Sequence, residues 1–251
     1  MDPVEGEQLT AALARAARSV LRGRLRSPED VLAEVVAAAA RAVPGADGAG
    51  ITQVGRDGRV SARVPSSSWV AELDRRQADL GEGPCVLASR IALGVDEMST
   101  VVQVAGHDQV IEVADMAVTG RMRWPRWAGE AVAAGVGSLL SFAMAPPEEP
   151  GSALNFYARE TDAFTEVSVL AGEAFATQTA IALFGARRAA QMHRAMQSRD
   201  VIDRAKGVLI ERFDVDDDQA FAILVEASQN TDAKLVDVAR EVSTQAQRRH
   251  H

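Results

Sequence analysis

The sequence is poor in the residues that build metal centres and disulfide scaffolds. A single cysteine, Cys85, occurs among 251 residues. One thiol cannot close an internal disulfide, which excludes a disulfide-stapled secreted scaffold and fits a reducing compartment. The four histidines form no zinc ligand set of familiar spacing, so we expect no metal site.

Aromatic residues are also scarce, at 4%, whereas 47% of the residues are hydrophobic. A chain of this length can bury roughly 70–75% of its unfolded surface without a metal or a disulfide. The longest apolar run in the first helical region, 35–40, is far shorter than the ~20 residues of a membrane span. The acidic, polar start at 1–8 does not resemble a signal peptide. We therefore expect a cytoplasmic protein that does not enter a membrane.

Positive charge is in deficit, since the net charge is −8, but the deficit is confined to the first part of the chain. The last 66 residues hold eleven Lys/Arg and eleven Asp/Glu, and 187–212 alone has seven cations against three acids. This asymmetry indicates two functional parts. Only two of the 27 cations are lysine, Lys206 and Lys234.

Hydrophobic periodicity in the first part alternates between helical and strand spacing. The motif SPED at 27–30 is a helix start, because it combines a capping hydroxyl, a proline at the first helical position and acids in the first turn. Helices are predicted at 7–22, 28–42, 66–80 and 125–134, and strands at 50–54, 59–64, 100–104, 110–113, 136–145 and 153–157. In the strand 136–145, one face is expected to hold Val136, Leu140, Phe142 and Met144. The pattern predicts an α+β domain.

From Phe164 onward no strand pattern returns, and 165–212 predicts one nearly unbroken helix. A second helix is expected around Asp216–Asp218, whose acids suit the positive helix N-terminus, and a third near Thr231 and Asp232. The inward faces are expected to be Ala220, Ile223, Leu224 and Ala227 on the second helix, and Leu235, Val238, Ala239 and Val242 on the third. We therefore expect a three-helix C-terminal module on a continuous helical stalk.

Two stretches resemble known families. Residues 74–184 resemble a GAF domain, an antiparallel sheet flanked by helices, of the type found in actinobacterial regulators; the matching motifs are LDR at 73–75 with Gln77, GEGPC at 81–85, RWPR at 123–126, GVGS at 135–138 and ALNFY at 153–157. The C-terminal part resembles an ANTAR domain through SRDVI at 198–202, AKGVLIER at 205–212, AFAIL at 220–224, ASQ at 227–229 and the segment 234–239. The resemblance implies a GAF sensor domain over 1–184 and an ANTAR RNA-binding domain over 185–249.

The ANTAR resemblance implies a dimeric, non-enzymatic regulator of transcription antitermination that recognises paired RNA stem-loops in mRNA leaders. The candidate RNA-binding residues are Arg199, Arg204, Lys206, Arg212 and Lys234. The steps from Arg199 to Lys206 and from Lys206 to Arg212 are each close to two helical turns, which favours a shared face.

Two features of the same helices favour a different interpretation. Charge alone also fits a solvated helix face with pairs such as Asp203–Lys206 at i, i+3. Asp232 stands where ANTAR domains usually carry Asn, and it adds a negative charge near the expected phosphate surface. The sequence therefore leaves open a ligand-sensing or dimerisation module that contacts only proteins, and a regulator that binds double-stranded DNA.

In the GAF part, the candidate ligand-pocket residues are Cys85, Trp124, Trp127 and Phe142. The alternative is structural: an inert thiol that closes the Gly-Pro turn, and tryptophans that fill the core. GAF domains bind many ligands or none, so a small-molecule ligand stays possible and its identity open. One cysteine and scattered histidines assemble no catalytic constellation, and we expect no catalytic residues.

The stalk carries more apolar surface than one small domain needs, at Ile181, Phe184, Met192 and Met196. The two methionines, four residues apart, suggest a seam between helices. We expect the stalk to pack against its copy in a parallel homodimer.

Overall fold

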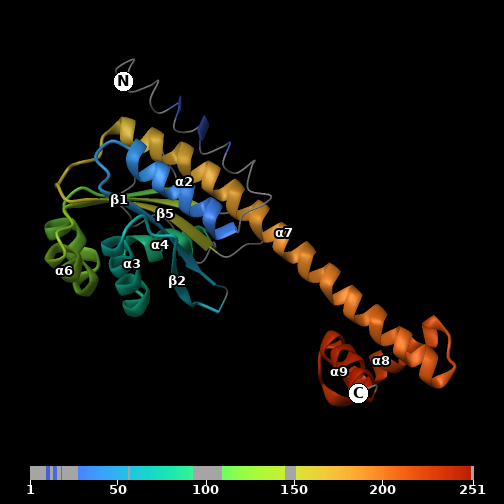
Figure 1. Ribbon diagram of the computed structural model, residues 1–251. Coiled ribbons are helices and arrows are strands. Elements are labelled where there is room, and N and C mark those ends of the chain that lie inside the picture. Colours follow the sequence, from blue (N-terminus) through green and yellow to red (C-terminus); the bar gives the residue numbers. More distant parts are fainter. Residues whose placement is uncertain are drawn as a thin grey trace. The chain divides into compact units, whose positions relative to one another are not determined.

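The computed structural model describes residues 28–55, 57–92, 109–144 and 151–249, together with five residues of the first 27 (Thr10, Ala11, Ala14, Arg15 and Arg18). The chain divides into two compact units, Met1–Ala186 and Arg187–His251, which helix α7 (Glu166–Phe213) joins (Figure 1). The apolar face expected for the helix 7–22 and the strand expected at 100–104 lie outside the described residues.

The first unit is built on a five-stranded sheet in the order β2-β1-β5-β4-β3, in which every neighbouring pair is antiparallel. The strands are β1 (Gly48–Val54), β2 (Val60–Arg63), β3 (Val110–Val113), β4 (Ser138–Met144) and β5 (Gly151–Ala158). Every residue of β4 and β5 is buried, because helices cover both faces of the sheet centre. The α+β class and the antiparallel sheet predicted from the sequence are confirmed.

Helices cover both faces of this sheet (Figure 1), and an apolar layer forms on each face. In one layer, α2 (Pro28–Ala42) and the first part of α7 pack over Leu140 and Phe142. In the other, α3 (Ser68–Leu80), α4 (Pro84–Ala92) and α6 (Pro125–Ala133) enclose Trp127 and Tyr157. Gly172 lets α7 approach closely, since a Cβ at that position would lie 2.4 Å from the ring of Phe142.

The strand pattern predicted that Val136 and Phe142 lie on the same face of the strand, and this prediction is wrong. Leu140, Phe142 and Met144 lie in the layer under α2 and α7, whereas Val136 packs in the opposite layer with Trp127. The reason is local: the strand begins only at Ser138, after a turn, so the alternation of faces does not extend back to Val136.

The segment before α6 holds a helical element that the sequence did not reveal. A π-helical turn, η3 (Met116–Gly120), continues into the short α5 (Arg121–Arg123). The Asp115 carboxylate caps this turn by accepting hydrogen bonds from the backbone N–H groups of Ala117 and Val118, at 2.8 and 3.1 Å. Such caps satisfy N–H groups that the first helical turn leaves unpaired.

Helix α7 runs unbroken for 48 residues, close to the span that the periodicity predicted. By length and composition it is also the one described helix that is able to cross a membrane, with a mean hydropathy of 1.4 over its most apolar 18 residues. Half of that window is buried inside the protein. Val169, Phe175 and Leu183 lie in the buried core of the first unit, so core packing accounts for part of the apolar character of this helix.

The second unit packs the last part of α7 against α8 (Asp217–Thr231) and α9 (Leu235–Arg249). Its buried core consists of Ala205, Leu209, Ala220, Leu224 and Ala239. A capping box starts α8: the Asp216 carboxylate accepts from the Gln219 N–H at 2.8 Å, and the Gln219 side chain accepts from the Asp216 N–H at 3.2 Å. The predicted three-helix module is confirmed.

Two details of the module differ from the sequence prediction. Ile223 is exposed rather than packed inward. Asp232 does not start the third helix but ends α8, in the left-handed conformation with φ of 52°. Asn adopts the left-handed conformation readily, because its short polar side chain forms local hydrogen bonds. This backbone conformation therefore accounts for the Asn that ANTAR domains usually carry where this chain has Asp232.

Candidate nucleic-acid interface

Lys206 lies in an ion-pair network within the C-terminal module rather than on an open cationic surface. Its Nζ is 2.7 Å from a carboxylate oxygen of Asp217 at the start of α8, and 3.6 Å from Asp203 on its own helix. Only 16% of the Lys206 side chain is exposed. The hydrogen bond to Asp217 raises the pKa of Lys206 above its ordinary value. Asp217, one of the acids expected at the start of the second helix, thus ties α8 to α7.

The other predicted cations do not all share a face with Lys206. Arg199, 85% exposed, lies 3.7 Å from Asp203. Arg212 follows Lys206 by six residues, a rotation of about 240° on an α-helix, and therefore points elsewhere. Its guanidinium lies 5.7 Å from the ring centroid of Phe213. The side chain of Lys234 is exposed just before α9, where its carbonyl accepts the N–H of Asp237.

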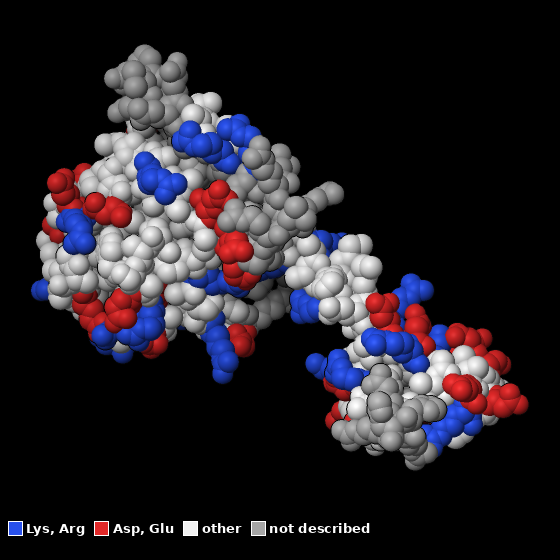
Figure 2. Space-filling model, in the orientation of Figure 1, with Lys and Arg blue, Asp and Glu red and all other residues white. Residues whose placement is uncertain are grey.

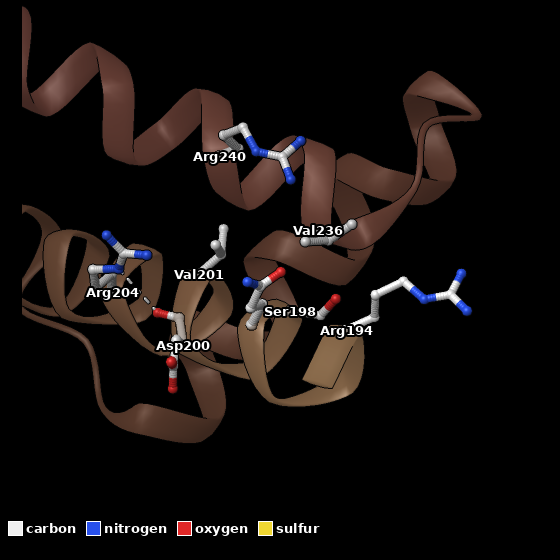
Figure 3. A pocket seen from close by; sticks show the side chains of 8 residues that line it. Arg194, Ser198, Asp200, Val201, Arg204, Val236 and Arg240 are labelled. Carbon is white, nitrogen blue, oxygen red and sulfur yellow. Dashed lines mark hydrogen bonds between the residues drawn. The ribbon is translucent and has the colours of Figure 1, made fainter. Parts of the chain in front are cut away.

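A groove between α7 and α9 does bring cations together (Figure 3). Its volume is about 420 Å³, and it lies wholly within the C-terminal module. Three arginines line it, Arg194 and Arg204 from α7 and Arg240 from α9, with the apolar side chains of Val201 and Val236 between them. Gln197, Ser198 and Asp200 also line it, and we call these eight residues the arginine groove.

Sequence reasoning found only Arg204 among the arginines of this groove. Arg194 and Arg204 are ten residues apart and bracket Val201, a spacing that places all three on one side of α7. That helical spacing was the one feature of the sequence from which Arg194 could have been predicted as a neighbour of Arg204. Arg240 carried no local signal, because it reaches the groove only through the packing of α9 on α7.

The surface around the groove carries mixed charge. Figure 2 shows Lys/Arg and Asp/Glu side chains interspersed on the visible face of the C-terminal module, in keeping with the equal counts in the last 66 residues. In Figure 3 the carboxylate of Asp200 points away from α9. The concentration of positive charge is therefore local to the groove rather than spread over the module.

The four candidate ligand-pocket residues of the first unit are not brought together. Cys85, Trp124 and Trp127 are buried in one apolar layer, whereas Phe142 is buried in the other, across the sheet. Trp127 is completely buried and directs its indole N–H to the Leu73 carbonyl at 3.5 Å. Their positions favour the structural interpretation, in which they fill the core. Among the described residues no three His, Cys, Asp or Glu side chains are grouped to hold a metal ion.

A buried polar cluster surrounds Cys85 instead. The Gln77 amide donates to the Cys85 Sγ and to the Tyr157 hydroxyl, both at 2.9 Å, and its carbonyl oxygen accepts the Cys85 N–H at 3.1 Å. The Tyr157 hydroxyl donates to Asp74 Oδ1. Burial, and next the nearby Asp74 carboxylate, raise the pKa of the Cys85 thiol far above its ordinary value. The thiol therefore stays protonated, which opposes a nucleophilic or redox role.

We predict that Cys85 in the native protein resists alkylation by iodoacetamide at pH 8 and reacts only after unfolding in urea. The thiolate is the reactive form, and both burial and the raised pKa suppress it. Mass spectrometry of the two samples measures the labelled fraction. Stoichiometric labelling of the native protein within minutes would show that the thiol is accessible and reactive, as a redox sensor requires.

Comparison with known proteins gives the family of the C-terminal module and the fold of the first unit. Residues 190–242 match the ANTAR domain family. Comparison with curated proteins gave no significant sequence match. The structure resembles bacteriophytochrome RpBphP3 of R. palustris with a TM-score of 0.52 and 10% identity, over 87% of this chain and 46% of that one. This likeness shows the fold of the first unit, and nothing about a chromophore.

Two further solved structures have lower TM-scores. The phycoerythrobilin-bound GAF domain of a cyanobacterial phytochrome aligns with a TM-score of 0.47 and 14% identity, over 71% of this chain and 96% of that one. A domain of a putative two-component sensor histidine kinase from Sinorhizobium meliloti 1021 aligns with a TM-score of 0.41 and 14% identity, over 61% of this chain and 91% of that one. The chain thus joins a domain of GAF-type fold to a C-terminal ANTAR domain.

Proposed function

We propose that the protein is an RNA-binding regulator of transcription antitermination, whose ANTAR domain binds paired stem-loops in mRNA leaders. The observation that carries this proposal is the ANTAR match over 190–242, a stretch that contains every residue of the arginine groove. Guanidinium groups bind phosphate oxygens in a planar, bidentate geometry, which suits a nucleic-acid backbone. Stabilising the paired stem-loops would prevent formation of a terminator hairpin.

The first domain, over 1–184, acts in this proposal as a sensor without catalysis. It biases the arrangement or the accessibility of the ANTAR domain, over 185–249, by shifting the population between two states. Its ligand would be a small molecule. Such a regulator works on nascent transcripts and is therefore cytoplasmic. Two copies, joined along α7, present two RNA-binding modules to the two stem-loops.

The test is equilibrium binding of the full chain to a tandem stem-loop RNA at several salt concentrations. We expect the logarithm of the affinity to fall linearly with the logarithm of the salt concentration, by roughly 0.7–0.9 for each phosphate contacted. A scrambled RNA and duplex DNA of equal length are the controls, and both should bind at least tenfold more weakly. Equal affinity for all three would contradict specific RNA recognition.

A protein-interaction module is the second candidate, because the charge on Lys206 is already paired with Asp217 and Asp203. Phe213, Phe221 and Ile223 are also exposed in the same module, and apolar surface of this kind serves protein contacts. Under this alternative the protein has no measurable preference for stem-loop RNA. The same titration therefore separates the two functions.

A further inference from the structure

The arginine groove combines two kinds of surface in one concave site. Its volume of about 420 Å³ falls within the ~300–1,000 Å³ typical of small-molecule sites. Val201 and Val236 supply apolar surface between the two helices, and the arginines stand around it (Figure 3). An occupant that fits has a flat, partly apolar body attached to an anionic group.

Two of the arginines are held in position by their own helix. Arg194 Nε donates to the Ala190 carbonyl at 3.3 Å, and Arg204 Nε donates to the Asp200 carbonyl at 3.2 Å. Neither has a carboxylate partner among the residues that the structure describes. Their terminal nitrogens therefore remain available to an anion, with part of the ordering of the side chain already achieved.

The third arginine has an exchangeable partner. Arg240 lies 2.7 Å from the Asp237 carboxylate, with both side chains more than half exposed. Exposed pairs of this kind contribute little to stability, so an incoming phosphate can replace the carboxylate. Val236 lies outside the buried core of the module, which leaves its side chain free to contact a ligand.

We propose that the arginine groove binds one unpaired nucleotide, its base placed against Val201 and Val236, its own phosphate held by Arg240 and the phosphates on either side of it held by Arg194 and Arg204. The inference rests on the proposed function, since the nucleotide then belongs to an RNA loop. Sequence-specific RNA recognition targets unstacked loop bases, which pack on apolar and guanidinium surfaces. A free nucleotide shares this chemistry and is the other possible source.

The experiment measures binding of four variants of the full chain to tandem stem-loop RNA. Arg240→Gln removes a charge, and we expect a loss of about tenfold with a salt slope flatter by roughly 0.7. Val236→Phe fills the groove without changing the charge, and we expect a similar loss with an unchanged slope. Ser198→Phe fills the groove from α7 and replaces Val236→Phe if that variant has a lowered melting temperature. Arg188→Gln, which removes an exposed arginine of α7 outside the groove, is the matched control and should lose less than threefold.

A second set of measurements distinguishes an RNA loop from a free nucleotide as the occupant. It also distinguishes failure of the groove proposal from failure of the proposed RNA-binding function. An RNA with abasic sites in both loops should bind the wild type as weakly as the intact RNA binds Val236→Phe. Wild-type RNA affinity in both groove-filling variants would overturn the groove while leaving RNA binding intact. AMP and GMP are titrated in parallel: binding of either one that Arg240→Gln abolishes, with no RNA binding, supports the groove and overturns the proposed function. Absence of both activities overturns both.

Discussion

Replacing Asp74 with asparagine is expected to abolish a fall in stability that the wild-type protein undergoes between about pH 4 and pH 7. Asp74 lies on α3, completely buried, and burial raises the pKa of its carboxyl from 3.8 to about 7, against the opposing hydrogen bond from Tyr157. Its second oxygen, Oδ2, has no hydrogen-bond partner among the residues that the structure describes. A Cβ at Gly50 would lie 2.3 Å from that oxygen, so β1 approaches closely there. The fold accommodates the neutral acid better than the carboxylate.

The direction of the effect follows from proton linkage. An acid whose pKa is higher in the folded than in the unfolded protein holds its proton more tightly when folded, so protonation stabilises the fold. This contribution is complete below about pH 4 and is lost as the pH rises to about 7. The shift of about three pKa units corresponds to about 4 kcal/mol of unfolding free energy.

Urea unfolding at pH 4, 5, 6, 7 and 8 measures this contribution. We expect Asp74→Asn to be the less pH-dependent protein, with its advantage over the wild type growing up to pH 7 and constant above it. Tyr157→Phe removes the hydrogen bond that lowers the pKa of Asp74, and should extend the decline to higher pH. Asp79→Asn, which removes an exposed carboxylate of the same helix, should keep the wild-type decline. Parallel curves for the wild type and Asp74→Asn would refute the neutral-acid assignment.

Local sequence patterns were sufficient to predict most helices and strands. The helical period was decisive for the stalk at 165–212, and the acids at 216–218 marked the start of α8 correctly. Errors arose where the chain changes element. Val136 shares the strand spacing of Phe142, but a turn separates it from β4 and changes its face. Asp232 is of a residue type that often starts a helix, but α9 begins later, at Lys234 and Leu235.

The candidate sites were harder to predict, because they depend on contacts between elements. Nothing near Lys206 in the sequence reveals Asp217, eleven residues away, as its closest partner. Asp74 lies in a charged, surface-like segment, and its burial depends on β1 and β5 packing over α3. Arg240 meets Arg194 and Arg204 only after α9 folds back on α7. Spacing therefore identifies a face, and tertiary packing decides what that face contacts.

The exposed apolar face of α7 predicts that the protein forms a dimer along this helix. Ile181, Phe184, Met192 and Met196 lie within about 120° of arc on α7. Ile181 is 63% exposed and Met192 is 69% exposed. Leu170, half exposed, continues the same arc toward the start of the helix. A soluble monomer rarely keeps so continuous an apolar stripe in water, and a second copy of the same helix offers a complementary stripe.

We expect the double variant Ile181→Glu/Phe184→Glu to convert a dimer into a monomer. Burying one large apolar side chain contributes about 1.5–3 kcal/mol, and both copies lose two of them. Four carboxylates would in addition face each other across the seam of a parallel pair. The dissociation constant should therefore rise at least about 100-fold. Light scattering at micromolar concentration measures the mass of each protein, and Met192→Glu/Met196→Glu should act in the same direction.

Ala190→Glu is the matched control, because Ala190 is exposed and lies about 180° from Ile181 on the same helix. Its added carboxylate should leave the dimer intact. Loss of the dimer should also weaken binding to the tandem stem-loop RNA far more than binding to a single stem-loop, since the second contact is no longer intramolecular. A monomeric mass for the wild type would refute the pairing along α7. Each RNA-binding module would then engage a single stem-loop, and the apolar stripe would need a different partner.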